Sequence, residues 1–371
     1  MKILIIGNGS SGINDKQDVI INNHTGDFLV GLKEKYKNVA YCSFVSKYVK
    51  NTNLLNFNLN KTDIDFIPVK QGNKLFLALE IIRLFFTKLW HYDFFYFFFP
   101  GSLGRFIAFL AILSGKNIGF YVRGELFGNT WIDRFVLKKS SFLLTVSPSI
   151  QDHLLKLNNN VEVIRPMVSI CEKDIVQRKL VKKDKYNLLF VGRIEKRKGV
   201  IELIDAYKIL REKHINIELT LVGGGDLLEE FQKEQNIGKI DKTIIFAGLI
   251  SDKSKLIEFY KSADVFVFPS HDEGFPRVLY DAMAQSLPIL TTMVGGIPGY
   301  LKPDYNCVAL PLKDANGLAD VIQETINKFC SLQALVDESR ITIKGILNKK
   351  SHEQLFEEYL NSNSNDKKNM E

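Results

Sequence analysis

The 371-residue sequence lacks an uninterrupted apolar run long enough to cross a membrane. A transmembrane helix needs about 20 consecutive, predominantly apolar residues. The longest apolar and aromatic stretch, residues 75–115, is interrupted by Glu80, Arg83, Lys88 and Asp93. No membrane-spanning helix is therefore predicted.

Patterns for metal ligands, disulfides and secretion are also missing. The four cysteines show no CxxC spacing, and the six histidines show no HExxH or other ligand spacing. Scattered cysteines favour buried thiols in a reducing compartment over a disulfide framework. The opening run MKILIIG ends at a glycine without a cleavage pattern, so it is not a signal peptide. These absences predict a cytoplasmic protein without a metal site.

The net charge of +7 is unevenly distributed along the chain. Residues 1–165 hold 20 Lys and Arg against 12 Asp and Glu, and the remainder holds 29 against 30. No nucleic-acid motif accompanies the basic half, so nucleic acid is not an expected partner. An anionic membrane surface is the more suitable partner for the basic residues 1–165.

Two interpretations of residues 75–115 remain open, and both can hold at once. In the first, two core helices flank a buried strand, FFYFFF. In the second, exposed aromatic residues beside Arg83, Lys88 and Arg105 form a peripheral membrane-docking face.

Short apolar runs alternate with amphipathic, helix-period segments along the chain. Ten strands are expected, at Lys2–Ile6, Val39–Phe44, Phe94–Phe98, Ile118–Val122, Leu143–Val146, Asn187–Val191, Glu218–Val222, Thr243–Phe246, Val265–Phe268 and Ile289–Thr291. Several are apolar on both faces, which is typical of parallel strands covered by helices. The alternation predicts an α/β class with doubly wound sheets.

This series occurs twice, with a charged stretch between. We expect an N-terminal Rossmann-like domain over 1–167, a linker over 168–185 and a C-terminal Rossmann-like domain over 186–347. A helix over 348–361, packing toward the first domain, and a disordered tail over 362–371 complete the chain. The two domains are expected to face a central cleft, because open α/β sheets bind ligands at the carboxyl ends of their strands.

A glycine motif, Gly7-x-Gly9-x-x-Gly12, follows the first expected strand. Taken alone it matches a dinucleotide-binding fingerprint. That fingerprint needs an acid after the second strand, which here runs into Ser46-Lys47, while Asp27 precedes that strand. A glycine loop that leaves room for a phosphate or sugar is therefore favoured over NAD binding.

In the second half, Arg193 and Lys198 follow a strand in FVGRIEKRKG. Such a pair suits a diphosphate, because arginine can grip it bidentately and lysine adds a point charge. A solvated basic turn is the alternative, since Lys196 and Arg197 are charged too.

Acids and glycines further along are equally ambiguous when taken alone. Glu273 and Asp281 in EGFPRVLYD are either a working pair or ordinary acids near a helix start. The turn Gly295-Gly296 either lets backbone N–H groups approach an anion or merely reverses the chain.

In order, LLFVGRIEKRKG, LTLVGGGDLLEEF, IIFAGLIS and LIEFYKSADVFVFPSHDEGFPRVLYDAMAQSLPILTTMVGGIP resemble the group 1 retaining nucleotide-sugar glycosyltransferases, which have the GT-B fold. The resemblance covers residues 188–298, and the first half agrees mainly in architecture and its opening glycine motif. It implies transfer of a sugar from a nucleotide-diphosphate donor to a glycan or lipid-linked acceptor. The domain over 1–167 would then bind the acceptor, and the domain over 186–347 would bind the nucleotide sugar. A catalytically silent nucleotide- or glycan-binding module of the same fold is the alternative.

The resemblance also implies residue roles. Glu273 would hold donor-sugar hydroxyls and Asp281 the nucleotide ribose, as the two ends of an E-x7-E motif. Arg193 and Lys198 would hold the diphosphate and, with Glu273, act as catalytic residues. The remaining donor-binding residues would be Gly9, Gly12, Arg123, Gly192, Gly274, Phe275, Pro276, Arg277, Val278, Gly295 and Gly296.

Three positions depart from the family pattern. Asp281 stands where glutamate is usual, and Gly299 where an acid is common. Arg123 replaces a histidine that many members carry; it either holds an anionic donor or acceptor group or pairs with Glu125.

The implied chemistry can work without a metal, because two cations and a helix start would stabilise the departing diphosphate. No cofactor is expected, because the nucleotide sugar is a substrate; a UDP-sugar is favoured over a GDP-sugar. The enzyme is expected in surface polysaccharide or glycolipid synthesis. It would be cytoplasmic, with peripheral contact to the inner membrane surface through the basic, aromatic first domain.

Overall fold

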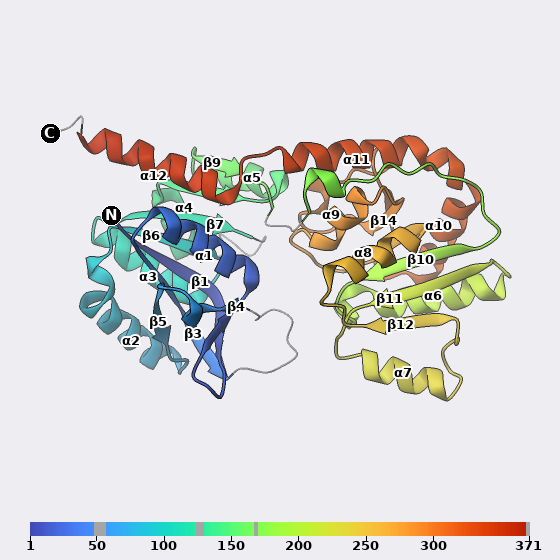
Figure 1. Ribbon diagram of the computed structural model, residues 1–371, viewed down its shortest axis with the longest axis horizontal. Helices are drawn as coiled ribbons and strands as arrows, with labels where there is room; N and C mark the ends of the chain where they lie inside the picture. The colour runs from blue at the N-terminus through green and yellow to red at the C-terminus, as the bar shows by residue number, and fades with distance from the viewer. Residues whose placement is uncertain (48–56, 124–129, 167–169, 369–371) are drawn as a thin grey trace. The chain divides into compact units, whose positions relative to one another are not determined.

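The computed structural model describes residues 1–47, 57–123, 130–166 and 170–368. The chain divides into two compact units. Unit 1 comprises Met1–Met167 and Lys349–Glu371, and unit 2 comprises Val168–Asn348. Each unit is a mainly parallel sheet covered by helices (Figure 1), so the predicted doubly wound α/β class is confirmed.

The sheet of unit 1 has the order β4-β2-β1-β6-β7-β8-β9, and β3 joins β1 to β5. The strands are β1 (Lys2–Ile13), β2 (Val19–Ile21), β3 (Asn38–Lys47), β4 (Phe57–Asn58), β5 (Asp65–Val69), β6 (Phe94–Phe99), β7 (Asn117–Val122), β8 (Phe142–Thr145) and β9 (Val161–Val163). Only the pairs made by β2, with β1 and β4, are antiparallel among the described strands. All six residues of β6 are buried, as expected for a parallel strand covered on both faces.

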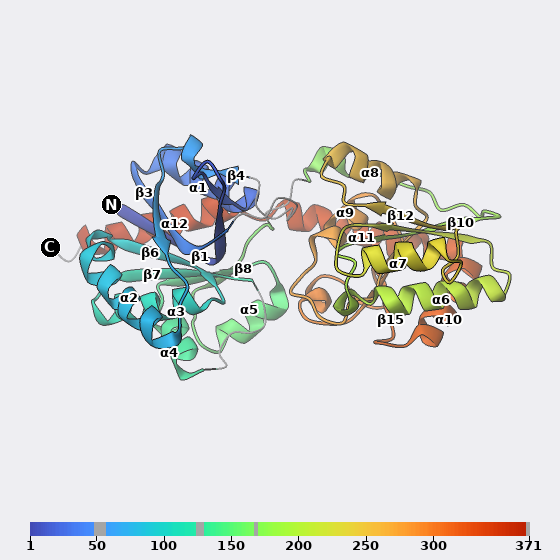
Figure 2. The same ribbon diagram turned by 90° about the horizontal axis from the view of Figure 1, so that it is seen from below.

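Helices cover both faces of this sheet. They are α1 (Asn23–Lys35), α2 (Lys74–Thr87), α3 (Ser102–Leu113), α4 (Trp131–Lys139), α5 (Pro148–Leu155) and α12 (His352–Lys368). Buried residues of α2, α3, α4 and α5 pack into one core cluster. Those of α1 and α12 pack into a second cluster on the other face. In Figure 2, α2, α3 and α4 lie together on their side of the sheet.

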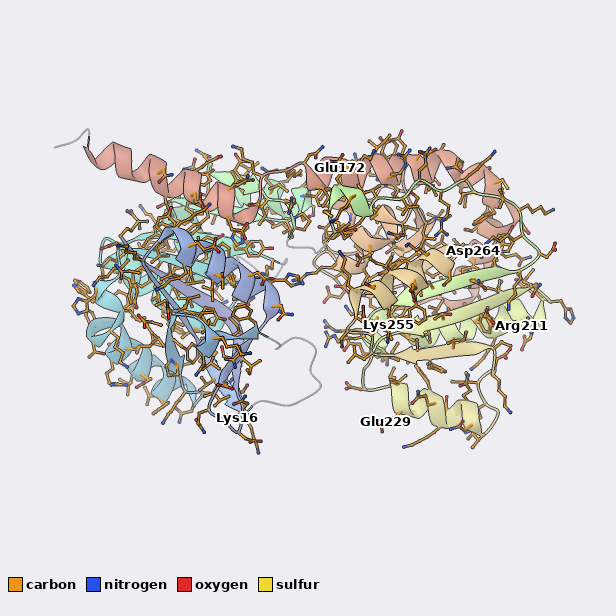
Figure 3. All side chains as sticks on the ribbon, in the orientation of Figure 1. Lys16, Glu172, Arg211, Glu229, Lys255 and Asp264 are labelled. Carbon is orange, nitrogen blue, oxygen red and sulfur yellow. The ribbon has the colours of Figure 1, made fainter. Side chains whose placement is uncertain are left out.

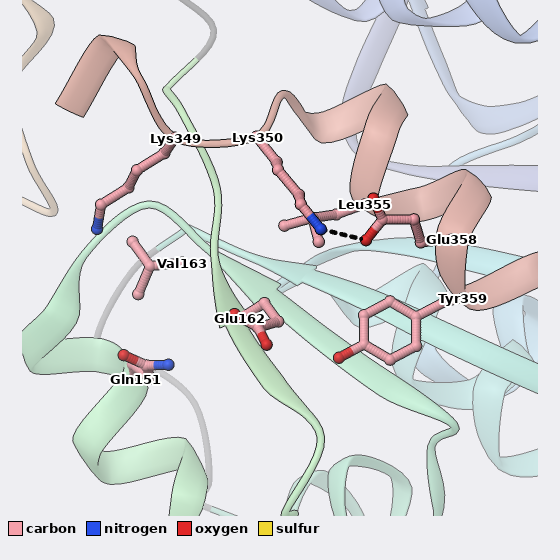
Figure 4. A pocket seen from close by; sticks show the side chains of 8 residues that line it. All are labelled: Gln151, Glu162, Val163, Lys349, Lys350, Leu355, Glu358 and Tyr359. Atoms are coloured by element: carbon pink, nitrogen blue, oxygen red, sulfur yellow. Dashed lines mark hydrogen bonds and ion pairs between the residues drawn. The ribbon is translucent and has the colours of Figure 1, made fainter. Parts of the chain in front are cut away.

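Helix α12 brings the end of the chain back into the core of unit 1. His352, at its start, is buried, with Nε2 at 2.5 Å from the Tyr96 hydroxyl and its ring stacked 4.2 Å from that of Phe28. Phe356 packs 4.7 Å from the ring of Tyr96. Beside this contact α12, α5 and β9 line a pocket of about 560 Å³, where Lys350 pairs with Glu358 at 2.7 Å (Figure 4).

Two segments of unit 1 differ from prediction. Helix α12 continues to Lys368 through the first residues of the expected disordered tail, because extending a formed helix avoids the cost of nucleation. Strand β1 continues through the expected glycine loop to Ile13. After a register shift, Ser10 to Ile13 pair with Phe44–Lys47 of β3, and this pairing satisfies backbone groups that a loop would leave open.

Unit 2 is a parallel sheet with the order β12-β11-β10-β13-β14-β15. Its strands are β10 (Tyr186–Val191), β11 (Ile217–Val222), β12 (Ile244–Gly248), β13 (Val265–Phe268), β14 (Ile289–Thr292) and β15 (Val308–Leu310). Its helices are α6 (Val200–Glu212), α7 (Leu228–Asn236), α8 (Lys253–Ser262), α9 (Arg277–Ala284), α10 (Ala315–Asn327) and α11 (Gln333–Leu347).

Residues 170–185, predicted as a linker, pack on unit 2. The Arg178 guanidinium donates to the carbonyls of Ala263 (2.5 Å) and Lys261 (3.0 Å), which lie at the end of α8. The terminal carbonyls of a helix lack intrahelical donors, and Arg178 supplies them. Asp264, labelled in Figure 3, accepts a hydrogen bond from Lys183 Nζ at 2.5 Å. These contacts hold the segment against the second sheet.

All ten predicted strands are present, and apart from the extended β1 and β3 their ends differ from the prediction by at most two residues. The prediction missed β2, β4, β5, β9 and β15. These are strands of two to five residues, too short to show a clear period in the sequence.

We predict that Phe356→Ala lowers the free energy of unfolding of unit 1 by about 3–5 kcal/mol, the usual cost of emptying a phenylalanine site. Phe356 is fully buried. Both tryptophans, Trp90 and Trp131, lie in unit 1, so urea unfolding followed by tryptophan fluorescence reports this unit.

Glu358→Ala on the same helix is the matched control. It removes only the exposed pair with Lys350, and we expect a change below about 1 kcal/mol. Equal losses in the two variants would contradict the packing of α12 in the core.

Candidate functional site

Loops that follow four neighbouring strands of unit 2 are joined by backbone hydrogen bonds. After β10 and β11, Ile194 N donates to Gly224 O at 2.9 Å. After β13, His271 N donates to Arg197 O at 2.9 Å. After β14, Gly296 N donates to Gly274 O at 2.6 Å. These loops lie at the carboxyl ends of parallel strands, where α/β sheets bind their ligands.

Two glycines allow the loops to approach this closely. Gly223 has a φ of +147°, and a Cβ atom there would overlap the carbonyl oxygen of Gly192. Gly295 has a φ of +56°, and a Cβ atom there would overlap the carbonyl oxygen of Glu273. Glycine favours both angles, and it alone has no Cβ atom to occupy that space. The GG turn therefore presses directly against the loop that carries Glu273.

The central charged contact of this surface joins Lys198 Nζ to Glu273 Oε1. Their side chains are only 9% and 15% exposed, so the two charges are largely removed from water. A buried charge is stable only when it is paired, and loss of one partner is costly. Lys198, predicted to bind the diphosphate, and Glu273, predicted to bind the sugar, are thus in direct contact.

The other predicted cation, Arg193, lies in the same loop but is 56% exposed. Its guanidinium is 3.3 Å from Glu195, and Glu195 also pairs with Arg197 at 2.6 Å. Sequence reasoning overlooked Glu195, although it is the one acid within GRIEKRKG. Gly192, at the base of the loop, donates its N–H to Val222 O at 2.9 Å.

Helix α9 begins where the sequence predicted, with Pro276 as its N-cap residue. No side chain caps the helix there, so the first N–H groups, at Arg277 and Val278, form its positive end. Phe275 packs on the rings of Tyr280 (4.6 Å) and Tyr300 (5.4 Å) and fixes the turn before the helix.

Asp281 occupies a different environment from Glu273. The pKa of Asp281 is raised to about 7, chiefly by burial; the charge of Lys253 opposes the shift, Asp174 adds to it, and Arg277 also opposes it. Asp174 and Lys253 form an ion pair at 3.3 Å. Both were overlooked because they come from segments far from EGFPRVLYD. The two acids of the motif therefore have different surroundings: Glu273 pairs with Lys198, whereas Asp281 is influenced by the charges of Lys253 and Asp174.

A second overlooked contact joins the loop after β13 to α6. His271 Nε2 is 3.2 Å from a carboxylate oxygen of Glu202 on α6, and the histidine side chain is 10% exposed. No ligand spacing marks this histidine in the sequence. Within the described ranges, no three His, Cys, Asp or Glu side chains are grouped so that they could hold a metal ion.

Three predicted donor-binding residues lie in unit 1. Gly9 and Gly12 are part of β1. Arg123 follows β7, with its guanidinium carbon 4.6 Å from the ring centre of Phe98 and 4.8 Å from that of Tyr121. Its Nε and Nη2 are buried without a hydrogen-bond partner. The alternative pair with Glu125 lies outside the described residues.

Residues 172–341 match the family model described as glycosyl transferases group 1. Unit 2 belongs to the group 1 glycosyl transferases. CapM of Staphylococcus aureus, named a capsular polysaccharide biosynthesis glycosyltransferase, is 31% identical over 179 residues, or 47% of this chain and 45% of CapM. A glycogen synthase of Mycobacterium tuberculosis is 27% identical over 222 residues, 58% of this chain and 53% of the synthase. The matches span about half the length of these curated relatives.

Solved structures of the same architecture extend over nearly the whole chain. HepE of Anabaena in complex with UDP has a TM-score of 0.67 at 16% identity, covering 98% of this chain and 100% of HepE. The apo form of the lipopolysaccharide outer core galactosyltransferase WaaB has a TM-score of 0.69 at 18% identity, with the same coverage. The predicted GT-B fold, of two Rossmann-like domains, is therefore confirmed.

We predict that Asp281 makes unit 2 less stable as the pH rises. Its carboxyl ionises near pH 3.9 when unfolded but near pH 7 when folded. Between these values the folded state binds the extra proton, so the free energy of unfolding falls by up to about 1.4 kcal/mol per pH unit. Asp281→Asn should remove this slope.

Thermal unfolding at several pH values, followed by circular dichroism, measures the slope; tryptophan fluorescence identifies the transition of unit 1. Asp272→Asn changes an exposed acid of the preceding loop and should leave the slope intact. The same slope in Asp281→Asn as in the unaltered protein would refute the assignment.

Proposed function

We propose that the protein is a configuration-retaining glycosyltransferase, which moves a sugar from a nucleoside-diphosphate donor to a glycan or lipid-linked acceptor. The observation that carries the proposal is the contact between Lys198 and Glu273 where the loops after β10 and β13 meet. A cation suited to phosphate and a carboxylate suited to hydroxyl groups are in contact there, in the unit that matches the group 1 family model, and this supports the proposal.

The reaction needs positive charge at a defined place. When the anomeric C–O bond breaks, negative charge grows on the departing nucleoside diphosphate. Lys198 is a buried point charge, Arg193 offers an exposed guanidinium fork, and the start of α9 adds backbone N–H groups. Fixed positive groups that bind the developing charge more strongly than the substrate lower the barrier.

The remaining polar groups would hold the donor. Glu273 would accept hydrogen bonds from sugar hydroxyls, and Asp281 from the ribose hydroxyls. Gly295 would offer its backbone N–H group close to Glu273, whereas the N–H of Gly296 already donates to Gly274 O and holds the two loops together. The buried, unpartnered N–H groups of Arg123 suit an anionic group on the donor or acceptor.

The relatives support a specific donor nucleotide and a specific class of acceptor. HepE has been solved with UDP and with UDP-glucose, which supports a UDP-sugar over a GDP-sugar. The names of CapM and WaaB point to capsular polysaccharide and lipopolysaccharide, which supports an acceptor in surface polysaccharide or glycolipid synthesis. We propose a cytoplasmic enzyme that needs neither a cofactor nor a metal.

A panel of UDP- and GDP-sugars tests the proposal through thermal shift and donor hydrolysis. UDP-sugars should raise the unfolding temperature of unit 2 and release UDP. Nucleotide binding without turnover, with every acceptor tried, would favour the silent binding module instead.

We predict that Arg193→Ala and Lys198→Ala each lower turnover by about 10²-fold or more, the range for losing one charge contact in the transition state. Initial rates of UDP release measure this. Lys196→Ala removes an exposed positive charge from the same loop and should retain activity.

Lys198→Ala also leaves Glu273 unpaired, so its unfolding temperature must be measured beside its rate. Arg193 is exposed, and its variant should fold normally. Full activity in Arg193→Ala and in a folded Lys198→Ala would refute the diphosphate assignment.

A further inference from the structure

Helix α2 carries an exposed apolar row. The exposed side chains of this row are Leu75 (73%), Leu79 (61%), Ile82 (45%) and Phe86 (58%), followed just beyond the helix by Trp90 (41%). The four helical positions have the spacing i, i+4, i+7 and i+11, which aligns them on one face. We call these five residues the α2 stripe. Figure 1 shows α2 at the outer edge of unit 1.

The α2 stripe is additional to the core-facing side of the helix. Ile81, Leu84 and Phe85 are buried and belong to the core cluster beneath α2. Single exposed apolar residues are common, but a contiguous row marks an interaction surface. At one end of the stripe Phe86 and Trp90 stack on each other at 5.7 Å, which makes a continuous aromatic surface.

The charges around the α2 stripe are basic. Besides Arg83, the exposed Lys70 and Lys88 are close enough to α2 to lower the pKa of its Glu80. Lys116 Nζ lies 5.3 Å from the ring centre of Trp90 and donates to the Trp90 carbonyl at 2.7 Å. The single acid of α2, Glu80, is neutralised by Arg83 at 2.7 Å.

We propose that the α2 stripe docks on an anionic lipid bilayer surface. Apolar side chains would enter the boundary between headgroups and acyl chains, tryptophan would occupy the interface, and the lysines would contact anionic headgroups. A second copy of this chain fits less well, because pairing of two α2 stripes would bring like charges at Lys70 and Lys88 together. The inference concerns where the protein works and goes beyond the proposed sugar transfer. Among the described helices, none is long and apolar enough to cross a membrane.

Flotation with vesicles tests the docking, using the full chain. Vesicles of phosphatidylcholine alone are compared with vesicles containing about one third phosphatidylglycerol. The protein should float with the anionic vesicles, and less strongly at high salt, because headgroup attraction is screened. The double variant Leu79→Ser/Phe86→Ser should reduce the bound fraction at least about tenfold. Both side chains are exposed, so the fold should be retained.

Ile237→Ser/Ile341→Ser is the matched control, since it removes two exposed apolar side chains from unit 2 (68% and 55% exposed). It should float like the unaltered protein. In a Trp131→Phe background Trp90 is the single tryptophan, and its emission should shift to shorter wavelength with anionic vesicles.

Absence of binding to anionic vesicles, or binding that Leu79→Ser/Phe86→Ser leaves unchanged, would overturn the proposal. So would a dimer in solution that this variant dissociates in the absence of lipid binding. Hydrolysis of donor in lipid-free solution should be the same in both double variants. Lipid binding without any donor turnover would leave the docking intact and reject the enzyme assignment instead.

Discussion

The ion pair between Lys198 and Glu273 is the contact on which the site of unit 2 depends. Neither charge would be stable alone where its side chain is so little exposed, so each requires the other. They meet because β10 and β13 are neighbouring parallel strands, so the loops that follow the two strands begin at the same edge of the sheet. The glycines at 223 and 295 then remove the side chains that would keep the loops apart.

Unit 1 is organised around a different constraint. Its sheet is buried on both faces, so helices must come from both ends of the chain to cover it. One face receives α12 from the end of the chain, through the buried ring of His352 and the side chain of Phe356. The other face receives α2, whose inner side completes the core and whose outer side carries the α2 stripe.

Strand positions were predictable because short apolar runs such as FFYFFF are typical of parallel strands that are covered on both faces. The start of α9 was predictable from local chemistry at Pro276. The path of residues 7–13 was not, because glycine permits a loop and a strand equally. The strand forms because these residues pair with β2, which follows closely, and with β3, which is distant in sequence. The segment at 170–185 resembled a linker because its contacts, such as those of Arg178, are with partners more than 80 residues away.

The order of the motifs in the sequence determined the family, the sheet class and the acids and cations of the candidate site. These features are recorded locally, in residue type and spacing. Only the tertiary structure decided their partners. Lys198 and Glu273 are 75 residues apart, and no spacing rule relates them. Likewise the pKa of Asp281 depends on burial and on Asp174, and the exposure of the α2 stripe depends on which side of α2 the sheet covers. Each is a property of packing, because solvent access is set by neighbours that the chain reaches only after it folds.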